Sequence, residues 1–118
     1  MRSMRVVVTG GRSYANRDVV AGELWALYEN DPSEFIVAHG GAKGADMLAD
    51  GWCDLVGVEK LVYPANWAVH GRAAGPIRNR KMLEEFRPAI VLAFPGGRGT
   101  ANCVRTAREL GILVKEVK

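Results

Sequence analysis

Apolar and polar positions follow two different periods along this chain, and the two periods alternate. Short apolar runs of the kind found in buried strands lie at residues 5–9, 35–38, 60–63, 88–94 and 112–117. Between them, apolar side chains recur with helical spacing at residues 20–28, 44–56, 76–86 and 100–110. Asn16 is a good N-cap for the first helix, Pro76 suits the first turn of the third, and Gly111 suits the end of the last. The pattern therefore predicts strands and helices in alternation.

This alternation calls for right-handed crossovers, a parallel sheet and helices on both of its faces. We expect a single α/β domain over residues 1–118, a three-layer Rossmann-like fold whose five-stranded parallel sheet has the strand order 3-2-1-4-5. In such sheets ligands bind beyond the carboxyl ends of the strands, where the strand order reverses. That point lies between the first and fourth strands, so the turns that follow them are the first candidates for a binding site.

Composition limits the function classes that fit. The chain has 118 residues, 48% of them hydrophobic, and no apolar run approaches the roughly 20 residues of a membrane-spanning helix. Residues 1–5 lead directly into the first strand, so we expect no signal peptide, no membrane partner and a cytoplasmic protein. Cys53 and Cys103 lack metal-ligand spacing, which fits a reducing compartment and predicts neither a metal nor a cofactor. A net charge of +3 is too mild to favour DNA binding by itself.

Three predicted turns at the carboxyl edge of the sheet are rich in glycine. They are residues 9–12 (Thr-Gly-Gly-Arg), 39–46 (His-Gly-Gly-Ala-Lys-Gly-Ala-Asp) and 95–100 (Pro-Gly-Gly-Arg-Gly-Thr). The last one joins a buried strand to a helix, so its backbone N–H groups and the positive end of the helix dipole point at one spot. Glycine lets a phosphate approach the backbone more closely than a Cβ would permit. We expect a nucleotide phosphate on the 95–100 turn, with ligand contacts from Gly10, Gly11, Arg12, Gly40, Gly41, Lys43, Gly96, Gly97, Arg98, Gly99 and Thr100.

Basic side chains reinforce this convergence. The loops and helix starts that should face the same edge carry Arg12, Lys43, Arg72, Arg78, Arg80 and Arg98. Any one of them is more simply a solvated surface residue, but the set around three glycine turns favours an anion site. Arg78 and Arg98 are the first candidates for phosphate contacts, because a guanidinium donates two parallel hydrogen bonds. Asn79 and Asn102 are candidates for contacts to a base or to the phosphate turn.

Two further side chains are candidates for catalysis, together with Arg78, and each also has a structural interpretation. Asp46 is the best-placed carboxylate for chemistry on a ligand, or it is a first-turn acid that stabilises its helix. His39 ends a buried strand, where it would act as a general acid, as a ribose contact or as a hydrogen-bonded core histidine. The sequence leaves these alternatives open.

Residues 64–75 are too long for a tight strand-to-helix turn, and long connections of this kind are often lids or partner surfaces. Trp67 lies in this segment, where it would stack on a base or act as a hydrophobic plug. Trp25 and Trp52 fall on predicted helix faces, as core residues or dimer contacts. The second helix would bury Leu55 on the same side as Trp52.

Taken together, the motifs resemble the SLOG superfamily. They are residues 40–46 (Gly-Gly-Ala-Lys-Gly-Ala-Asp), 78–80 (Arg-Asn-Arg) and 95–100. The most similar members are the small stand-alone YspA-type domains of unknown function, which share the pattern at residues 9–14, Trp67, His70-Gly71 and residues 75–79. The resemblance spans nearly the whole chain. It implies a Rossmann-like fold, one SLOG-like domain over residues 1–118 that binds a nucleotide or nucleotide-derived ligand, and a homodimer or higher homo-oligomer.

Three functions are implied by this resemblance. The first is a sensor or sequestering domain that holds its ligand without turnover. The second is that of the LOG phosphoribohydrolases, N-glycosidases that release the base from a nucleoside 5′-monophosphate with an arginine and a glutamate. Arg78 resembles that arginine, but Cys103 stands at the position of the glutamate, and a thiol does not replace a carboxylate in this chemistry. The third is the single-stranded DNA binding of DprA, which an aromatic content of 8% does not favour.

Overall fold

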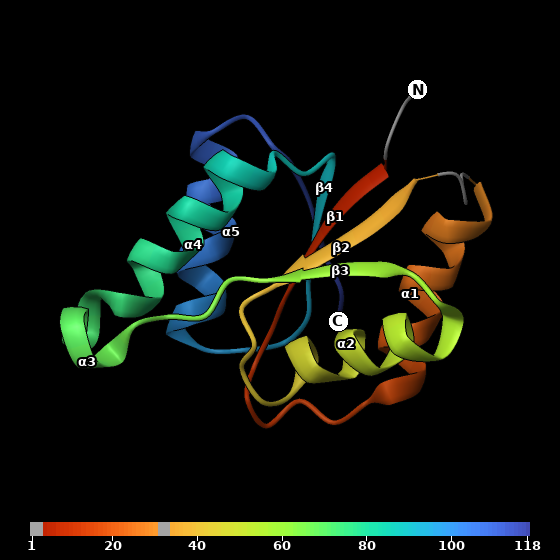
Figure 1. Ribbon diagram of the computed structural model, residues 1–118, viewed down its shortest axis with the longest axis horizontal. Coiled ribbons are helices and arrows are strands. Elements are labelled where there is room, and N and C mark those ends of the chain that lie inside the picture. The colour runs from red at the N-terminus through yellow and green to blue at the C-terminus, as the bar shows by residue number, and fades with distance from the viewer. Residues whose placement is uncertain (1–3, 31–33) are drawn as a thin grey trace.

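The computed structural model describes residues 4–30 and 34–118, and its centre is one parallel sheet. The strands are β1 (Met4–Thr9), β2 (Phe35–His39), β3 (Glu59–Val62), β4 (Ile90–Ala93) and β5 (Leu113–Glu116). Their order is β3-β2-β1-β4-β5 and each neighbouring pair is parallel, which confirms the predicted Rossmann-like sheet. The helices are α1 (Arg17–Asn30), α2 (Ala45–Val56), α3 (Trp67–His70), the 3₁₀ turn η1 (Gly71–Ala73), α4 (Ala74–Phe86) and α5 (Arg98–Glu109). Figure 1 shows α1 and α2 on one face of the sheet and α4 and α5 on the other.

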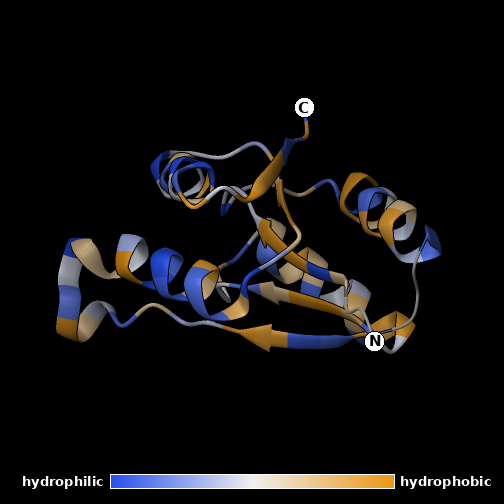
Figure 2. Ribbon diagram, turned by 90° about the horizontal axis from the view of Figure 1, so that it is seen from above, coloured by the Kyte–Doolittle hydropathy of each residue, from blue (hydrophilic) through white to orange (hydrophobic). Residues whose placement is uncertain are grey.

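Strand β1 lies at the centre of the sheet, and its alternating side chains supply both halves of the core. Val6 and Val8 pack in the apolar cluster formed with α1 and α2, whereas Val7 packs in the cluster formed with α4 and α5. All three side chains are fully buried, as a strand covered on both faces requires. The edge strands β3 and β5 have mostly exposed side chains. In Figure 2 the central strands carry orange, hydrophobic segments between the two layers of helices.

The helix faces and the element boundaries differ from the prediction in several places. Leu55 was expected on the buried side of α2, yet it is 87% exposed. This helix buries the face that carries Cys53, and Leu55 lies about 200° around the helix axis from that residue. Trp52 is in the core, where its ring packs edge-to-face against Trp25 with centroids 5.4 Å apart. Strand β3 begins one residue earlier than predicted, and α5 begins two residues earlier, at Arg98.

Residues 64–75 form regular structure rather than the open loop that their length indicates. They contain α3, η1 and the first two residues of α4, which begins at Ala74. Asn66 caps α3, because its Oδ1 accepts a hydrogen bond from the Val69 N–H at 3.1 Å. Pro76 lies in the first turn of α4, as predicted, where a missing N–H costs the helix no hydrogen bond. The segment therefore projects beyond the sheet as a helical extension of α4 (Figure 1).

Helix length and polarity bear on membrane association. Within the two described ranges, none of the helices is both long enough and apolar enough to cross a bilayer.

Candidate functional site

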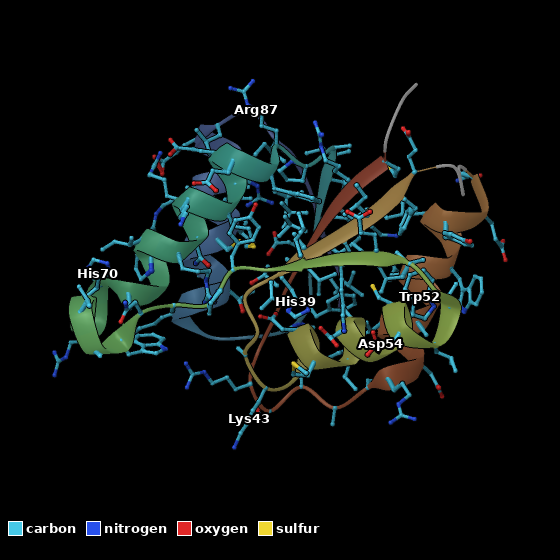
Figure 3. The ribbon with its side chains drawn as sticks, viewed as in Figure 1. His39, Lys43, Trp52, Asp54, His70 and Arg87 are labelled. Carbon is cyan, nitrogen blue, oxygen red and sulfur yellow. The ribbon has the colours of Figure 1, made fainter. Side chains whose placement is uncertain are left out.

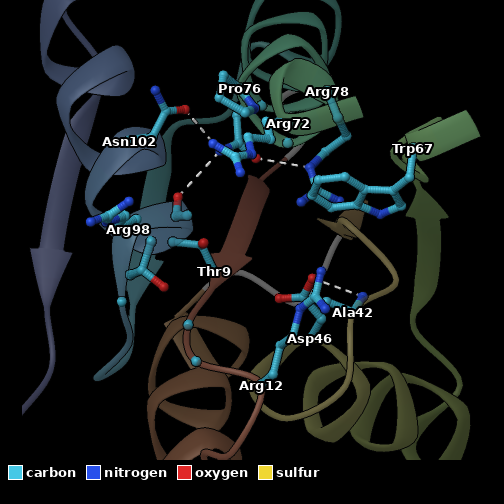
Figure 4. A pocket seen from close by; sticks show the side chains of 17 residues that line it. Thr9, Arg12, Ala42, Asp46, Trp67, Arg72, Pro76, Arg78, Arg98 and Asn102 are labelled. Carbon is cyan, nitrogen blue, oxygen red and sulfur yellow. Dashed lines mark hydrogen bonds between the residues drawn. The ribbon is translucent and has the colours of Figure 1, made fainter. Parts of the chain in front are cut away.

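The loops that follow β1, β2 and β4, together with the start of α4, enclose a cleft of about 490 Å³ at the carboxyl edge of the sheet (Figure 4). Small-molecule sites typically occupy about 300–1,000 Å³. The predicted site residues that line the cleft are Gly10, Gly11, Arg12, Asp46, Arg78, Asn79, Gly97, Arg98, Gly99 and Thr100. Trp67, Arg72 and Asn102 line it as well. Sequence reasoning missed four further lining residues: Thr9, Ala42, Gly75 and Pro76.

The glycine loops pack directly against one another. The Gly11 N–H donates to Pro95 O at 2.9 Å, and Gly11 O accepts from the Ala45 N–H at 3.3 Å. A Cβ at Gly96 would lie 2.6 Å from the Gly11 nitrogen, and a Cβ at Gly44 would collide with the Gly11 carbonyl. Glycine is needed at these positions because neighbouring backbone occupies the space of a side chain. The loops after β1, β2 and β4 therefore form one packed unit beneath the cleft.

The start of α5 is, by contrast, open toward the cleft. Gly97 is the N-cap of this 12-residue helix, and no side chain caps it. Among the described residues, no hydrogen bond uses the backbone N–H of Arg98, Gly99 or Thr100. A Cβ at Gly97 or Gly99 would meet nothing within 4 Å. Free N–H groups at the positive end of a helix dipole form an anion-binding geometry.

Four arginines and a single aspartate line the cleft, so its charge is predominantly positive. Three of the arginines, Arg12, Arg72 and Arg98, are exposed. None of these three forms an ion pair within the described part of the chain. Their guanidinium groups are therefore free to bind an anion that enters the cleft.

Arg78 lines the cleft as predicted, but most of its donors are already used by the protein. Its Nε donates to Asn79 Oδ1 at 2.8 Å, and its Nη1 donates to Gly40 O at 2.8 Å and Tyr63 O at 3.3 Å. Burial lowers the pKa of Arg78, and the neighbouring Asp46 carboxylate opposes this shift. Arg78 thus ties the loop after β2 to α4, in addition to lining the cleft.

Asn79 is 3% exposed and connects α4 to α5. Its Nδ2 donates to Asn102 Oδ1 at 3.0 Å and to Gly99 O at 3.3 Å (Figure 4). Its Oδ1 accepts the hydrogen bond from Arg78. Because both ends of the amide are engaged, Asn79 positions Asn102 and the start of α5.

Asp46 is the one carboxylate among the described residues that line the cleft. Its Oδ2 accepts from the Gly40 N–H at 3.0 Å and the Ala42 N–H at 3.2 Å. Burial raises the pKa of Asp46, although these hydrogen bonds and the charge of Arg78 oppose the shift. Asp46 therefore supports the loop after β2 and also presents an ionisable group to the cleft.

His39 lies outside the cleft and belongs to a buried polar network (Figure 3). Its Nε2 lies 2.8 Å from Asp50 Oδ2, and its Nδ1 accepts from the Gly41 N–H at 2.9 Å. Because Nδ1 is an acceptor, Nε2 carries the proton and donates to Asp50. Lys60 Nζ extends the network, at 2.6 Å from Asp50 and 2.7 Å from Asp54. His39 is therefore a fully buried core residue with both ring nitrogens engaged, and it does not line the cleft.

Four other predicted contacts lie outside the cleft lining: Gly40, Gly41, Lys43 and Gly96. Lys43 is exposed and extends into solvent in Figure 3. A Cβ at Gly40 would collide with the Arg78 guanidinium, and Gly96 packs against Gly11. At both glycines, neighbouring atoms of the packed loops occupy the space that a side chain would need.

Arg80 and Cys103 are also removed from the cleft. Arg80 was expected to face the cleft, but it does not line it. Its guanidinium instead forms ion pairs with Glu84 at 3.5 Å and Glu109 at 3.9 Å. Cys103 is fully buried. Burial raises the pKa of its thiol to about 11, although a hydrogen bond with Thr9 opposes this shift. The side chain at this position is therefore a neutral, buried thiol. Within residues 4–30 and 34–118, no group of three or more His, Cys, Asp or Glu side chains is placed to hold a metal ion.

Among solved structures, the X-ray structure of TM1055 superposes with a TM-score of 0.74 at 20% identity, over 94% of this chain and 72% of that chain. A UDP-GlcNAc 2-epimerase from Neisseria meningitidis, bound to UDP-GlcNAc, gives a TM-score of 0.63 at 16% identity. That match covers 97% of this chain but 31% of the epimerase. At these identities the likeness is one of fold alone.

Sequence comparison identifies the family. A sequence model of the YAcAr family, described as the YspA, cpYpsA-related SLOG family, matches residues 4–70. The Gene 61 protein of Mycobacterium phage D29 is 38% identical over 117 residues, which cover 93% of each chain. The matched segment contains the turns after β1 and β2, and the phage protein extends the match into the turn before α5. The chain therefore belongs to the YspA, cpYpsA-related SLOG family.

Proposed function

We propose that this chain binds a phosphorylated nucleoside derivative in the cleft and holds it as a sensor or sequestering domain. The phosphate would lie on the 95–100 turn. One observation carries the proposal: the start of α5 offers free N–H groups and open space to a cleft that three unpaired arginines also line. Membership of the SLOG family supports a nucleotide-related role.

The phosphate contacts follow from the orientation of the helix. Phosphate oxygens would accept hydrogen bonds from the N–H groups at residues 98–100 and from the guanidinium groups of Arg98 and Arg72. The first turn of α5 carries no acidic residue that would compete with the anion. Gly97 and Gly99 leave room for the phosphate to reach the backbone.

A nucleoside-monophosphate phosphoribohydrolase is the alternative that a specific observation favours. Asp46 lines the cleft, and its raised pKa brings it closer to that of a general acid. Asp46 would then take the part for which Cys103 is chemically unsuited. Chromatography of the bound ligand separates the two functions, because only the hydrolase yields free base and sugar phosphate.

Substitution of Gly97 tests the proposal directly. A screen of nucleoside 5′-monophosphates by thermal shift identifies a ligand, since ligand at 100 times its Kd stabilises the native state by about 2.7 kcal/mol. Gly97→Asp places a carboxylate at the N-cap of α5, where it competes with phosphate, and Gly97→Asn is the neutral control of the same size. We expect Gly97→Asp to weaken binding at least tenfold relative to Gly97→Asn in titration calorimetry.

Asp at an N-cap also stabilises a helix, so Gly97→Asp should melt no lower than Gly97→Asn. Equal affinity of the two variants would refute the phosphate assignment. A wild-type protein that binds no nucleotide but binds single-stranded DNA, with an affinity that falls steeply with salt, would refute it as well.

A further inference from the structure

We propose that Trp67 and Arg12 form a base-stacking subsite at one side of the cleft, so that the ligand is a nucleotide with its aromatic base still attached. The proposal rests on the proposed function, because it adds a base subsite to the phosphate site at the start of α5. It assigns a role to the two cleft residues that combine aromatic surface with a free cation.

Trp67 differs from the other two tryptophans of the chain in its surroundings. Trp52 is 6% exposed; Trp25 is 40% exposed but lies outside the cleft, with its ring packed edge-to-face against Trp52. Trp67 is 49% exposed and lines the cleft from α3. A half-exposed indole that faces a cleft, rather than the core, offers a planar surface to a ligand.

Arg12 lies over this surface from a distant part of the chain. Its guanidinium carbon is 5.6 Å from the centroid of the Trp67 ring, within the range of a cation–π interaction. Arg12 forms no ion pair with any described residue, so its charge remains available. Nucleic-acid-binding proteins use this combination, because a base stacks on an aromatic ring and on the plane of a guanidinium.

The backbone that carries Trp67 is held in place before a ligand binds. Asn66 caps α3 through its hydrogen bond with the Val69 N–H. A Cβ at Gly75 would lie 3.5 Å from the far edge of the Trp67 ring, so the indole already rests over the start of α4. Little conformational entropy is then lost when a base stacks on the indole.

The two ends of the cleft have the separation of chemistry that a nucleotide requires. Figure 4 shows Arg98 at one side and Trp67 at the other, with Asp46 between them in this view. The phosphate site is polar and cationic, whereas the opposite side presents an aromatic face. A sugar phosphate without a base would fill the first part and make no contact with Trp67 and Arg12.

The test compares ligands with and without a base. Titration calorimetry measures the Kd of the four ribonucleoside 5′-monophosphates and of ribose 5-phosphate for the wild type and for Trp67→Ala, Trp67→Phe and Arg12→Gln. We expect the preferred monophosphate to bind the wild type more tightly than ribose 5-phosphate. Trp67→Ala should raise the Kd of the monophosphate by about 5- to 150-fold, which corresponds to about 1–3 kcal/mol of binding free energy. The Kd of ribose 5-phosphate for Trp67→Ala should stay within about twofold of its wild-type value. Trp67→Phe should lose less affinity for the monophosphate than Trp67→Ala does.

Fluorescence gives an independent readout that a merely structural tryptophan would not move. The monophosphate should quench the indole emission of the wild type, and this quenching should disappear in Trp67→Phe, because Trp25 on α1 and Trp52 on α2 do not line the cleft. Equal losses for ribose 5-phosphate and the monophosphate in Trp67→Ala would overturn the proposal and identify Trp67 as a plug that holds residues 64–75.

The control for the proposed function is built into the same titrations. Wild-type protein that binds ribose 5-phosphate and the monophosphates equally well would overturn the base subsite and leave the phosphate site intact. Protein that binds none of these probes, with Gly97→Asp and Gly97→Asn indistinguishable, would overturn both.

Discussion

Substitution by alanine should have different effects on stability at Gly96 and Gly99, which are three positions apart. It should lower the free energy of unfolding at Gly96 and leave it unchanged or raise it at Gly99. A Cβ at Gly96 would lie 2.6 Å from the Gly11 nitrogen and 3.0 Å from the Gly10 carbonyl carbon. It would also press against Thr100 Oγ1. Two of these three neighbours are backbone atoms, so the loops after β1 and β4 must separate to admit the methyl group.

The cost of this separation has three parts. Overpacking costs about 1–3 kcal/mol, and weakening the 2.9 Å hydrogen bond from Gly11 to Pro95 costs about 0.5–1.5 kcal/mol. The reduced entropy of the unfolded chain returns about 0.4–1 kcal/mol. We expect Gly96→Ala to lower the free energy of unfolding by about 0.5–4 kcal/mol, and each kcal/mol corresponds to about 4 °C in Tm in a domain of this size.

Gly99→Ala is the matched control. Gly99 lies in the first turn of α5, and a Cβ there would meet nothing within 4 Å. We expect this variant to be as stable as the wild type or up to about 1 kcal/mol more stable, because alanine favours a helix. Its methyl group would enter the cleft, so it should weaken binding of a phosphorylated ligand while the fold remains intact.

Urea unfolding followed by circular dichroism measures both variants. Two results would show that the assignment of Gly96 to loop packing and Gly99 to the open cleft is wrong. One is a Gly96→Ala variant as stable as the wild type. The other is a Gly99→Ala variant that loses as much free energy of unfolding as Gly96→Ala.

Three further predictions concern buried ionisable groups. Because burial raises the pKa of Asp46 above its ordinary value of 3.8, this residue contributes fully to stability below pH 3.8, and the contribution is lost as pH rises through the pKa of the folded state. In Asp46→Asn the amide oxygen can still accept hydrogen bonds from the loop, so this variant should unfold at a higher urea midpoint than the wild type at pH 7. The difference between the two midpoints should disappear below pH 3.8. A lower midpoint for the variant at pH 7 would contradict this reasoning. Burial raises the pKa of Asp50, but hydrogen bonds from Lys60 and His39 outweigh this effect and hold the pKa below its usual range. The contribution of Asp50 to folding stability is therefore present above pH 3.8 and is lost as pH falls. Lys60→Met should raise the pKa of Asp50 in an NMR titration and destabilise the protein at pH 7 but not in acid, and an unchanged titration would argue against the pairing. Burial raises the pKa of Cys103 to about 11 and that of Cys53 to about 12, so native protein at pH 8 should resist iodoacetamide by mass spectrometry until urea exposes both thiols; rapid alkylation of folded protein would show that burial is incomplete.

The sheet could be predicted because its signals are local and repeated. The apolar run of β1 places Val6 and Val7 on opposite faces of the sheet whichever helices cover them. Strand–helix alternation then restricts the topology to a few possibilities. Leu55 was misplaced because the buried face of α2 depends on which side chains the sheet admits, and those are small ones such as Ala49 and Cys53. Residues 64–75 were misread because their length, rather than their helix cap at Asn66, was taken as the signal.

The site was predictable as a region and less so as a set of side chains. Three glycine turns at the ends of neighbouring strands meet in space because parallel strands bring their carboxyl ends to one edge. Thr9 and Ala42 were missed because residues of such common types carry no chemical signal. The surroundings of His39 could not be predicted, because its partners Asp50 and Gly41 are brought to its ring by the fold. Lys43 extends into solvent, and a loop position alone does not fix a side chain's direction.

The packing around Gly11 limits how this cleft can be redesigned or can diverge in evolution. Its N–H and carbonyl join the loops of three strands, so a change in length or shape of one loop must be accommodated by the other two. Residues 97–99 and the helical extension at 64–75 lie outside this junction. New ligand specificity is therefore more accessible through insertions and substitutions in those two segments, where a graft alters the contents of the cleft without dismantling its floor.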